Sequence, residues 1–204
     1  MNDTAGPGRV LIVGGAAGVG STVADAVAHA GGQPIVMDLV APRRSHVHFA
    51  VDLADTQLTE SVAGFIAADG LDAVITCAPL DTVGSEDLEG EAAGTAVAIR
   101  ASMGALIESQ GQVFAVGSTL GPPDPPGASA LCASEFDVVG HSSALTAGSR
   151  VRITCVGATG SPNDSAPTGP SMDPVEVAQV IVDLLHARGP ANPPQSTIPP
   201  GRHS

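Results

Sequence analysis

The chain has 204 residues, the usual length of one domain and enough to bury a core without disulfides or metal. Its formal net charge of −13, from 21 acidic and eight basic residues, excludes a basic surface for nucleic acid or an anionic membrane. No secretory leader or membrane-length apolar run is visible, and three widely spaced cysteines (Cys77, Cys132 and Cys155) indicate reduced thiols, so a cytoplasmic protein is expected.

The N-terminal part alternates short apolar runs with helical patterns. RVLIV at 9–13 is typical of a buried strand, and apolar residues recur at helical spacing from 19 to 30, where a Gly-Gly pair ends the helix. Two more strands are predicted at 33–38 and 46–52. The linker between them is too rich in proline and arginine for a crossover helix.

The same alternation continues to the end of the chain. The sequence predicts, in chain order, a helix at 56–68, a strand at 72–78, a long helix at 86–110, a strand at 112–118, a helix at 131–147, a strand at 151–156, a helix opening at Asp173-Pro174 and a short strand at 196–198. Strands that alternate with helices imply a doubly wound α/β fold, a parallel sheet with helices on both faces. Residues 1–204 are expected to form one such domain, with a flexible substrate or lid loop at 157–172 and a short last strand and tail at 190–204.

A glycine-rich turn, VGGAAGVGS, follows the first predicted strand. Gly14, Gly18 and Gly20 give this turn a G-x-x-x-G-x-G spacing between a strand and a helix. Glycine permits a tight turn and lets backbone N–H groups approach a pyrophosphate at the helix N-terminus. Asp38 ends the next strand, where a carboxylate can accept hydrogen bonds from ribose hydroxyls. The pattern favours a dinucleotide site, and a structural turn without ligand is the alternative.

These motifs resemble those of the short-chain dehydrogenase/reductase family, and further matches follow in order along nearly the whole chain. VDLAD is similar to the family's adenine-contacting segment, DAVITCAP to the strand that usually ends in Asn-Asn-Ala-Gly, and GQVFAVGSTLG to the strand with the catalytic Ser. MDPVEVAQVIVDLL is similar to the penultimate helix. The resemblance implies a Rossmann-like fold and NAD rather than NADP. It implies cofactor contacts at Gly14, Gly18, Val19, Gly20, Asp38, Asp52 and Ala78.

The same resemblance implies that the family's redox chemistry is altered. In the family, Tyr exchanges a proton with the substrate oxygen, Lys lowers the Tyr pKa, Ser orients the carbonyl and Asn holds a water. Matching the flanks places Ser118 at the Ser, Leu131 at the Tyr and Glu135 at the Lys. Glu91, three residues before a glycine, stands at the Asn. The chain has no Tyr at all, so standard carbonyl reduction is not expected.

Two further departures concern the nicotinamide half of the cofactor site. Pro79 replaces the Gly that closes the family's fourth-strand motif, and Ala158-Thr159 replaces a Pro-Gly near the nicotinamide. The adenosine half therefore resembles the family and the nicotinamide half does not. NAD binding and the absence of a cofactor both stay open.

Three hypotheses about function remain. In the first, Glu135 and Glu91 are acid and base and Ser118 is a hydrogen-bond donor in dehydration, cyclisation or isomerisation of a small carbonyl metabolite. In the second, the protein is a non-catalytic partner of an active homologue. In the third, it is an NAD oxidoreductase with an unorthodox proton donor. A homo-oligomer, or a hetero-oligomer with a homologue, is expected through the long helices that form the family's dimer interface.

Several polar residues favour simpler roles. His46 and His48 alternate on one face of a predicted edge strand, where polar side chains are ordinary, and no metal site is predicted there. Arg43 and Arg44 are of the type that binds the 2′-phosphate of NADP, but Asp38 argues against that cofactor.

Overall fold

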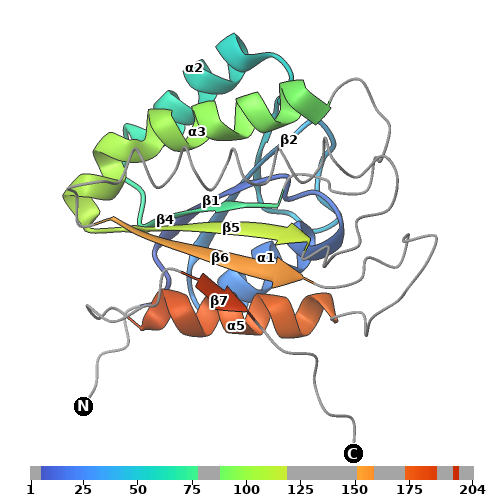
Figure 1. Ribbon diagram of the computed structural model, residues 1–204, viewed down its shortest axis with the longest axis vertical. Helices are drawn as coiled ribbons and strands as arrows, with labels where there is room; N and C mark the ends of the chain where they lie inside the picture. The colour runs from blue at the N-terminus through green and yellow to red at the C-terminus, as the bar shows by residue number, and fades with distance from the viewer. Residues whose placement is uncertain (1–5, 78–87, 119–150, 159–172, 188–194, 198–204) are drawn as a thin grey trace, which may run out of the picture.

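The computed structural model describes residues 6–77, 88–118, 151–158, 173–187 and 195–197. Across these ranges, seven parallel strands form one sheet in the order β3-β2-β1-β4-β5-β6-β7 (Figure 1). The strands are β1 (Arg9–Val13), β2 (Gln33–Asp38), β3 (Val47–Ala50), β4 (Ala73–Thr76), β5 (Gln112–Ser118), β6 (Arg152–Ala158) and β7 (Gln195–Thr197). The chain winds outward from β1 in one direction and from β4 in the other, which is the doubly wound α/β fold predicted from the sequence.

Helices cover both faces of the sheet (Figure 1). In the described residues, α2 (Thr56–Ala67) and α3 (Leu88–Ser109) pack side by side on one face, and α1 (Gly18–His29) packs against α5 (Pro174–His186) on the other. β1 shows why its sequence is a continuous apolar run. Its residues alternate between the two faces, so Leu11 faces α2 and α3 while Ile12 faces α1 and α5.

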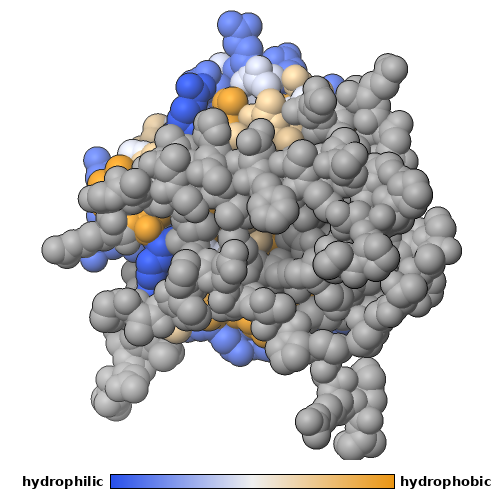
Figure 2. All heavy atoms as spheres, in the orientation of Figure 1, coloured by the Kyte–Doolittle hydropathy of each residue, from blue (hydrophilic) through white to orange (hydrophobic). Residues whose placement is uncertain are grey.

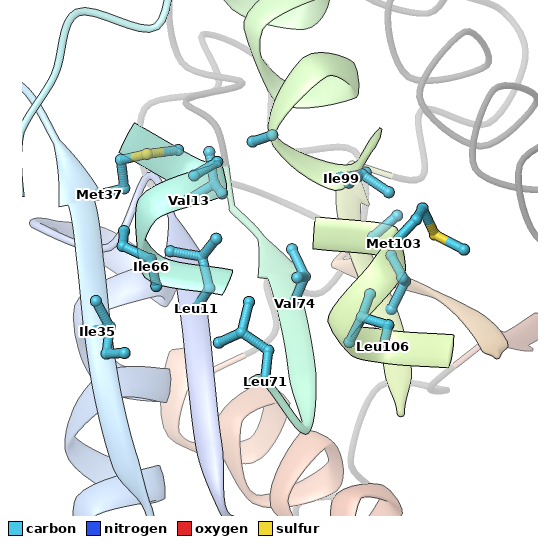
Figure 3. Close-up of a cluster of buried hydrophobic side chains, with 14 of the residues drawn as sticks. Leu11, Val13, Ile35, Met37, Ile66, Leu71, Val74, Ile99, Met103 and Leu106 are labelled. Atoms are coloured by element: carbon cyan, nitrogen blue, oxygen red, sulfur yellow. The ribbon is translucent and has the colours of Figure 1, made fainter. Parts of the chain in front are cut away.

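The core under α2 and α3 is aliphatic, as the scarcity of aromatic residues in the chain predicts (Figure 3). Strand residues meet helix residues there; the labelled side chains are Leu11, Val13, Ile35, Met37 and Val74 from the strands, Ile66, Ile99, Met103 and Leu106 from the helices, and Leu71 from the turn before β4. Each fully buried leucine or isoleucine stabilises the fold by about 1.5–3 kcal/mol relative to an exposed one. Truncating one of them, as in Leu11→Ala, costs about 2–5 kcal/mol.

Two aspartates begin helices at the places where the sequence predicts helix starts. The Asp173 carboxylate accepts a hydrogen bond of 2.9 Å from the N–H of Val175, and Pro174 occupies the first turn of α5. The Asp55 carboxylate accepts one of 3.0 Å from the N–H of Leu58 at the start of α2. Both helices therefore begin with a side chain that satisfies an otherwise unpaired backbone donor.

Some predicted boundaries are wrong. The third strand, predicted at 46–52, covers only Val47–Ala50, because its one neighbour β2 ends at Asp38, opposite Ala50. The predicted loop at 157–172 begins later, because Gly157 and Ala158 still belong to β6 and pair with the end of β5. The predicted helix at 131–147 lies outside the described residues.

The described surface carries both polar and apolar side chains. On the face shown in Figure 2, hydrophobic residues lie among hydrophilic ones. The large hydrophobic residues that are exposed are Leu39, Val40, Val47, Leu58, Phe65, Ile107 and Val175. Of the helices in the described ranges, none is both long enough and apolar enough to cross a membrane.

Candidate functional site

The winding of the chain reverses between β1 and β4, and ligands of such sheets bind at the carboxyl ends of the strands at this point. β1 leads there into the glycine-rich turn. The backbone N–H of Gly14 donates a hydrogen bond of 3.0 Å to the carbonyl of Met37, so the turn is attached to β2. Gly14 has φ +78° and Gly18 has φ +52°, backbone conformations that residues other than glycine rarely adopt.

Gly20 lies in the first turn of α1, where the helix backbone closely approaches the backbone of Gly14. A Cβ added to Gly20 would overlap the carbonyl oxygen of Gly14, so no larger residue fits. A Cβ on Gly18, in contrast, would meet no atom within 4 Å. The turn therefore packs closely on its inner side and leaves open space beside Gly18, where a ligand can approach the backbone.

The N-terminus of α1 is not capped by its own side chains. Its N-cap residue is Ala17, which makes no side-chain cap hydrogen bond. The hydroxyls of Ser21 and Thr22 both donate to the carbonyl of Gly18, at 3.0 and 3.1 Å. The first N–H groups of the helix, at its positive end, thus keep their capacity to bind an anion such as a pyrophosphate. These features fit a dinucleotide.

Asp38 ends β2 beside this turn, as the sequence predicts. Its Oδ2 accepts a hydrogen bond of 2.9 Å from the N–H of Ala16, and its Oδ1 accepts one of 3.1 Å from the N–H of Val40. The residue is half-buried. A carboxylate oxygen can accept more than one hydrogen bond, so Asp38 also has capacity for ribose hydroxyls. Leu39 and Val40, 64% and 65% exposed, follow it directly and present apolar surface next to this carboxylate.

The other predicted cofactor residues lie along the same edge or outside the described residues. Asp52 is exposed, lies two residues beyond the end of β3, and accepts a hydrogen bond of 3.0 Å from the N–H of Ala54. Val19 is half-buried in α1 and packs against the core shared with α5. Ala78 is not among the described residues. The preceding Cys77 donates its N–H to the carbonyl of Val13 at 2.7 Å, which joins the end of β4 to that of β1.

Cys77 is half-buried at the end of β4, and its surroundings do not favour a nucleophilic thiol. Burial raises the pKa of its thiol to about 12. The reactive thiolate form is therefore negligible at neutral pH. The side chain packs against the core between the sheet and the helices α1 and α5.

Two of the three predicted catalytic residues are at least partly described, and both belong to the carboxyl-end side of the sheet. Ser118 is the last residue of β5, opposite Ala158 of β6. Glu91 is in the first turn of α3, is half-buried, and has its Oε2 shielded from solvent. Glu135, like Leu131, lies outside the described residues. The convergence of Glu91, Ser118 and Glu135 on one cleft therefore stays a prediction.

Gly94 explains how α3 is placed beside this edge. A Cβ on Gly94 would overlap the carbonyl oxygen of Leu53, so the helix lies directly against the loop that follows β3. This is the glycine that marks Glu91 in the sequence. The sequence pattern indicates the glycine, and the structure supplies its physical reason, the backbone-to-backbone approach of two segments.

The prediction that His46 and His48 share a strand face is wrong. His46 precedes β3, and its Nε2 lies 2.8 Å from Oδ1 of Asp25 on α1. His48 is in β3, with its Nε2 3.0 Å from the carbonyl oxygen of Asp38. In the described ranges, no group of three or more His, Cys, Asp or Glu side chains could hold a metal ion.

One further signal in the sequence bears on the catalytic positions. All eight basic residues of the chain are arginines, so the sequence contains neither a Tyr nor a Lys. Sliding the sequence against the family motif therefore cannot supply either residue.

The contact between Asp25 and His46 has no signal in the sequence, because a single acidic residue in an amphipathic helix does not indicate a tertiary partner.

Similarity to solved structures supports the fold. No protein-family model matches the chain, and no curated protein matches its sequence. Similar solved structures include ligand-free aldohexose dehydrogenase from Thermoplasma acidophilum, with 15% identity over 91% of this chain and 89% of that chain, at a TM-score of 0.75. A short-chain dehydrogenase from Leptospira borgpetersenii with bound NAD+ shares 15% identity over 93% and 89% of the two chains, at a TM-score of 0.75.

A third similar structure carries the other nicotinamide cofactor. It is a short-chain dehydrogenase from Burkholderia cenocepacia in complex with NADP, 17% identical over 94% of this chain and 87% of that chain, with a TM-score of 0.76. Identities this low show the architecture and leave cofactor choice and chemistry to the chain's own residues. The protein therefore has the Rossmann-like, doubly wound parallel fold of these short-chain dehydrogenases.

Proposed function

We propose that the protein binds NAD at the glycine-rich turn and performs acid–base chemistry on a small carbonyl metabolite, without the family's Tyr-dependent hydride transfer. The observation that carries the cofactor part is the position of the Asp38 carboxylate, held beside the turn by the N–H groups of Ala16 and Val40. An acidic side chain at this point accepts a hydrogen bond from the ribose 2′-hydroxyl of NAD and repels the 2′-phosphate of NADP. NAD is favoured over NADP for that reason.

Each part of the site has a role toward the dinucleotide. The backbone of Gly14, Gly18, Val19 and Gly20 would hold the pyrophosphate at the N-terminus of α1. The exposed Leu39 and Val40 offer apolar contact for the adenine ring, with Asp52 beyond the end of β3 nearby in the sheet. The resemblance implies a further contact at Ala78, which lies outside the described residues. NAD, when bound, supplies a ring that accepts hydride. The altered nicotinamide half suggests that the residues of the chain, more than this ring, determine the reaction.

The proposed chemistry rests on carboxylates. The chain has no Tyr and no Lys, and the resemblance to short-chain dehydrogenases implies that Glu91 and Glu135 stand at the family's Asn and Lys positions. Two carboxylates that share a water-poor cleft repel each other, so one holds a proton and serves as the acid while the other serves as the base. Ser118 would donate a hydrogen bond to the substrate carbonyl. Proton removal next to a carbonyl, as in dehydration, cyclisation or isomerisation, needs such a set of groups.

The lack of Tyr and Lys supports a second candidate function. A subunit that has lost the proton donor and its Lys can retain the fold and stabilise an active homologue through its long helices. The two candidates differ in the role of Glu135. Acid–base catalysis requires its carboxylate, whereas assembly with a homologue does not.

Cofactor binding is tested with the fluorescence of NADH. Because the chain has neither Trp nor Tyr, the protein has almost no emission of its own, and the signal comes from the cofactor. Titration should give saturable NADH binding that is tighter than NADPH binding, with the same order found by calorimetry. A folded protein that binds neither nucleotide would disprove the cofactor part of the proposal.

The chemistry is tested with an assay that does not require the substrate to be identified. A panel of ketones and hydroxyketones is incubated with the protein in D2O, and exchange of the hydrogens next to the carbonyl is followed by NMR. Glu135→Gln should slow exchange by roughly 10²–10⁴-fold. Glu108→Gln, at an exposed position near the end of α3, is the control and should have no effect.

Other outcomes of these experiments would support the alternative functions. No exchange with any compound, together with an active complex that tolerates Glu135→Gln after co-expression with an intact homologue, supports the partner subunit. Steady oxidation of NADH by a ketone supports an oxidoreductase with an unorthodox proton donor.

A further inference from the structure

The linker between β2 and β3, residues 39–46, is attached to α1 through one carboxylate. Oδ2 of Asp25 forms an ion pair with Nε of Arg44 at 3.0 Å, and Oδ1 lies 2.8 Å from Nε2 of His46. The side chain of Asp25 is 30% exposed and that of His46 only 10%. The contact with His46 is therefore shielded from water, whereas Arg44 lies at the surface.

The parallel sheet determines the path of this linker. Ala50 of β3 lies opposite Asp38, and Val47 lies opposite Ile35. The linker therefore leaves the carboxyl end of β2 and returns toward the amino end before β3 begins. α1 makes the same return, and Asp25 is seven residues beyond Gly18. We call the contacts of Asp25 with Arg44 and His46 the clamp. At 1.5 Å per residue, the clamp holds Arg44 about 10 Å along the helix from Gly18.

The position of Arg44 matters because a guanidinium near the ribose is the group that accommodates a 2′-phosphate. The linker carries two such groups, Arg43 and Arg44, a few residues after the Asp38 carboxylate. Arg44 is occupied by Asp25 on the side of α1. Arg43 is exposed, and it forms no ion pair with any residue that the structure describes.

We propose that Asp25 is a selectivity residue for the dinucleotide site. By holding Arg44 and His46 against α1, it keeps one of the two guanidinium groups of the linker away from the ribose, which preserves the preference of Asp38 for NAD over NADP. The inference rests on the proposed function to the extent that the glycine-rich turn binds a dinucleotide. It adds a residue on α1, remote from the cofactor, that acts through the position of the linker.

A purely structural role for Asp25 predicts a different result. If the clamp only braces the fold, its removal lowers stability and weakens both cofactors by the same factor. If the clamp controls selectivity, its removal releases Arg44 and changes the ratio of the two affinities. The ratio of dissociation constants for NADPH and NADH is therefore the informative measurement.

The experiment compares wild type, Asp25→Ala and the double variant Asp25→Ala/Arg44→Ala, with NADH and NADPH titrations at low salt. Alanine favours helix at position 25, so α1 should persist. The single variant should gain affinity for NADPH relative to NADH by about threefold or more, the size of an exposed charge interaction. The double variant should return to the wild-type ratio. Glu60→Gln, which removes the negative charge from the 2.9 Å pair with Arg100 between α2 and α3, should leave the ratio unchanged.

Hydrogen exchange gives a second measurement that needs no nucleotide. The amides of residues 39–46 should exchange faster in Asp25→Ala than in wild type, while those of the core strands stay protected. An unchanged affinity ratio or unchanged linker exchange in the folded variant would overturn the inference, even when wild type binds NADH. A wild type that binds neither cofactor would instead refute the proposed function, and this inference with it.

Discussion

Oδ2 of Asp38 accepts a hydrogen bond of 2.9 Å from the backbone N–H of Ala16. The two residues are 22 positions apart in the sequence, and this hydrogen bond links the end of β2 to the glycine-rich turn. The same carboxylate receives the N–H of Val40 on its other oxygen. A single side chain thus orders both segments that border the proposed ribose site, and its loss should affect cofactor affinity more than overall stability.

Asp38→Asn tests this arrangement. Asparagine has one acceptor oxygen and no charge, so it cannot serve both N–H groups and the ribose hydroxyls. NADH affinity should fall roughly tenfold, in line with one hydrogen bond to a charged group, while NADPH affinity changes less. The control is Asp69→Asn, at a 79% exposed side chain near the end of α2, which should leave both affinities unchanged. Equal losses for both cofactors in Asp38→Asn would contradict the ribose contact.

Gly20→Ala should damage the turn itself. The new Cβ would overlap the carbonyl oxygen of Gly14, so α1 or the turn must move, at a cost of about 1–3 kcal/mol in the free energy of unfolding. NADH binding should be lost with it. Gly64→Ala in α2 is the matched control, because a Cβ there meets nothing within 4 Å. It should raise stability by about 0.5–1 kcal/mol. Urea unfolding measures both changes.

Two glycines of α3 give an independent pair of variants. Gly94→Ala should destabilise the protein by about 1–3 kcal/mol, because its Cβ would push the helix away from the carbonyl of Leu53. Gly104→Ala, on an exposed position of the same helix with open space around a Cβ, should stabilise it by about 0.5–1 kcal/mol. Similar effects of the two substitutions would show that α3 does not lie against the loop after β3.

Alkaline pH should reveal the shielded thiol of Cys77, a half-buried residue. Its pKa is raised from 9.0 to about 12, so between these values the unfolded chain loses a proton that the folded chain retains. Stability should therefore be complete below about pH 9 and fall by roughly 2 kcal/mol by pH 10.5. The chain has no Tyr and no Lys, so its three cysteines are the only side chains that ordinarily titrate near this pH range. Cys77→Ala should flatten the slope, as measured by urea unfolding at each pH; an unchanged slope would contradict the burial.

Much of the fold is predictable from the sequence because its signals are local. RVLIV is apolar at every position because a central parallel strand is buried on both faces. The start of α5 is predictable because Asp173 and Pro174 act within the first turn. The glycine spacing indicates the turn, and Asp38 falls at the end of β2 as predicted, since a strand end needs only the periodicity of its own residues.

Contacts between distant segments are not predictable in this way. The sequence pattern places His46 within a strand, whereas β3 begins one residue later and the His46 ring lies against Asp25. Nothing in the sequence near either residue indicates the other, because their contact depends on how the linker returns beside α1. The approach of Gly94 to Leu53 is of the same kind, since a glycine in a helix does not reveal which backbone it touches.

The sequence by itself determined the order of the described strands and helices, the glycine-rich turn and the lack of any Tyr or Lys, because these follow from residue types and their local spacing. Only the tertiary structure decided that Asp38 bonds to Ala16, that α3 packs on the loop after β3, and that Asp25 holds Arg44 and His46. The physical reason is that these contacts are made by groups brought together when the apolar faces of the sheet and helices are buried, and local periodicity encodes the burial but not the partners.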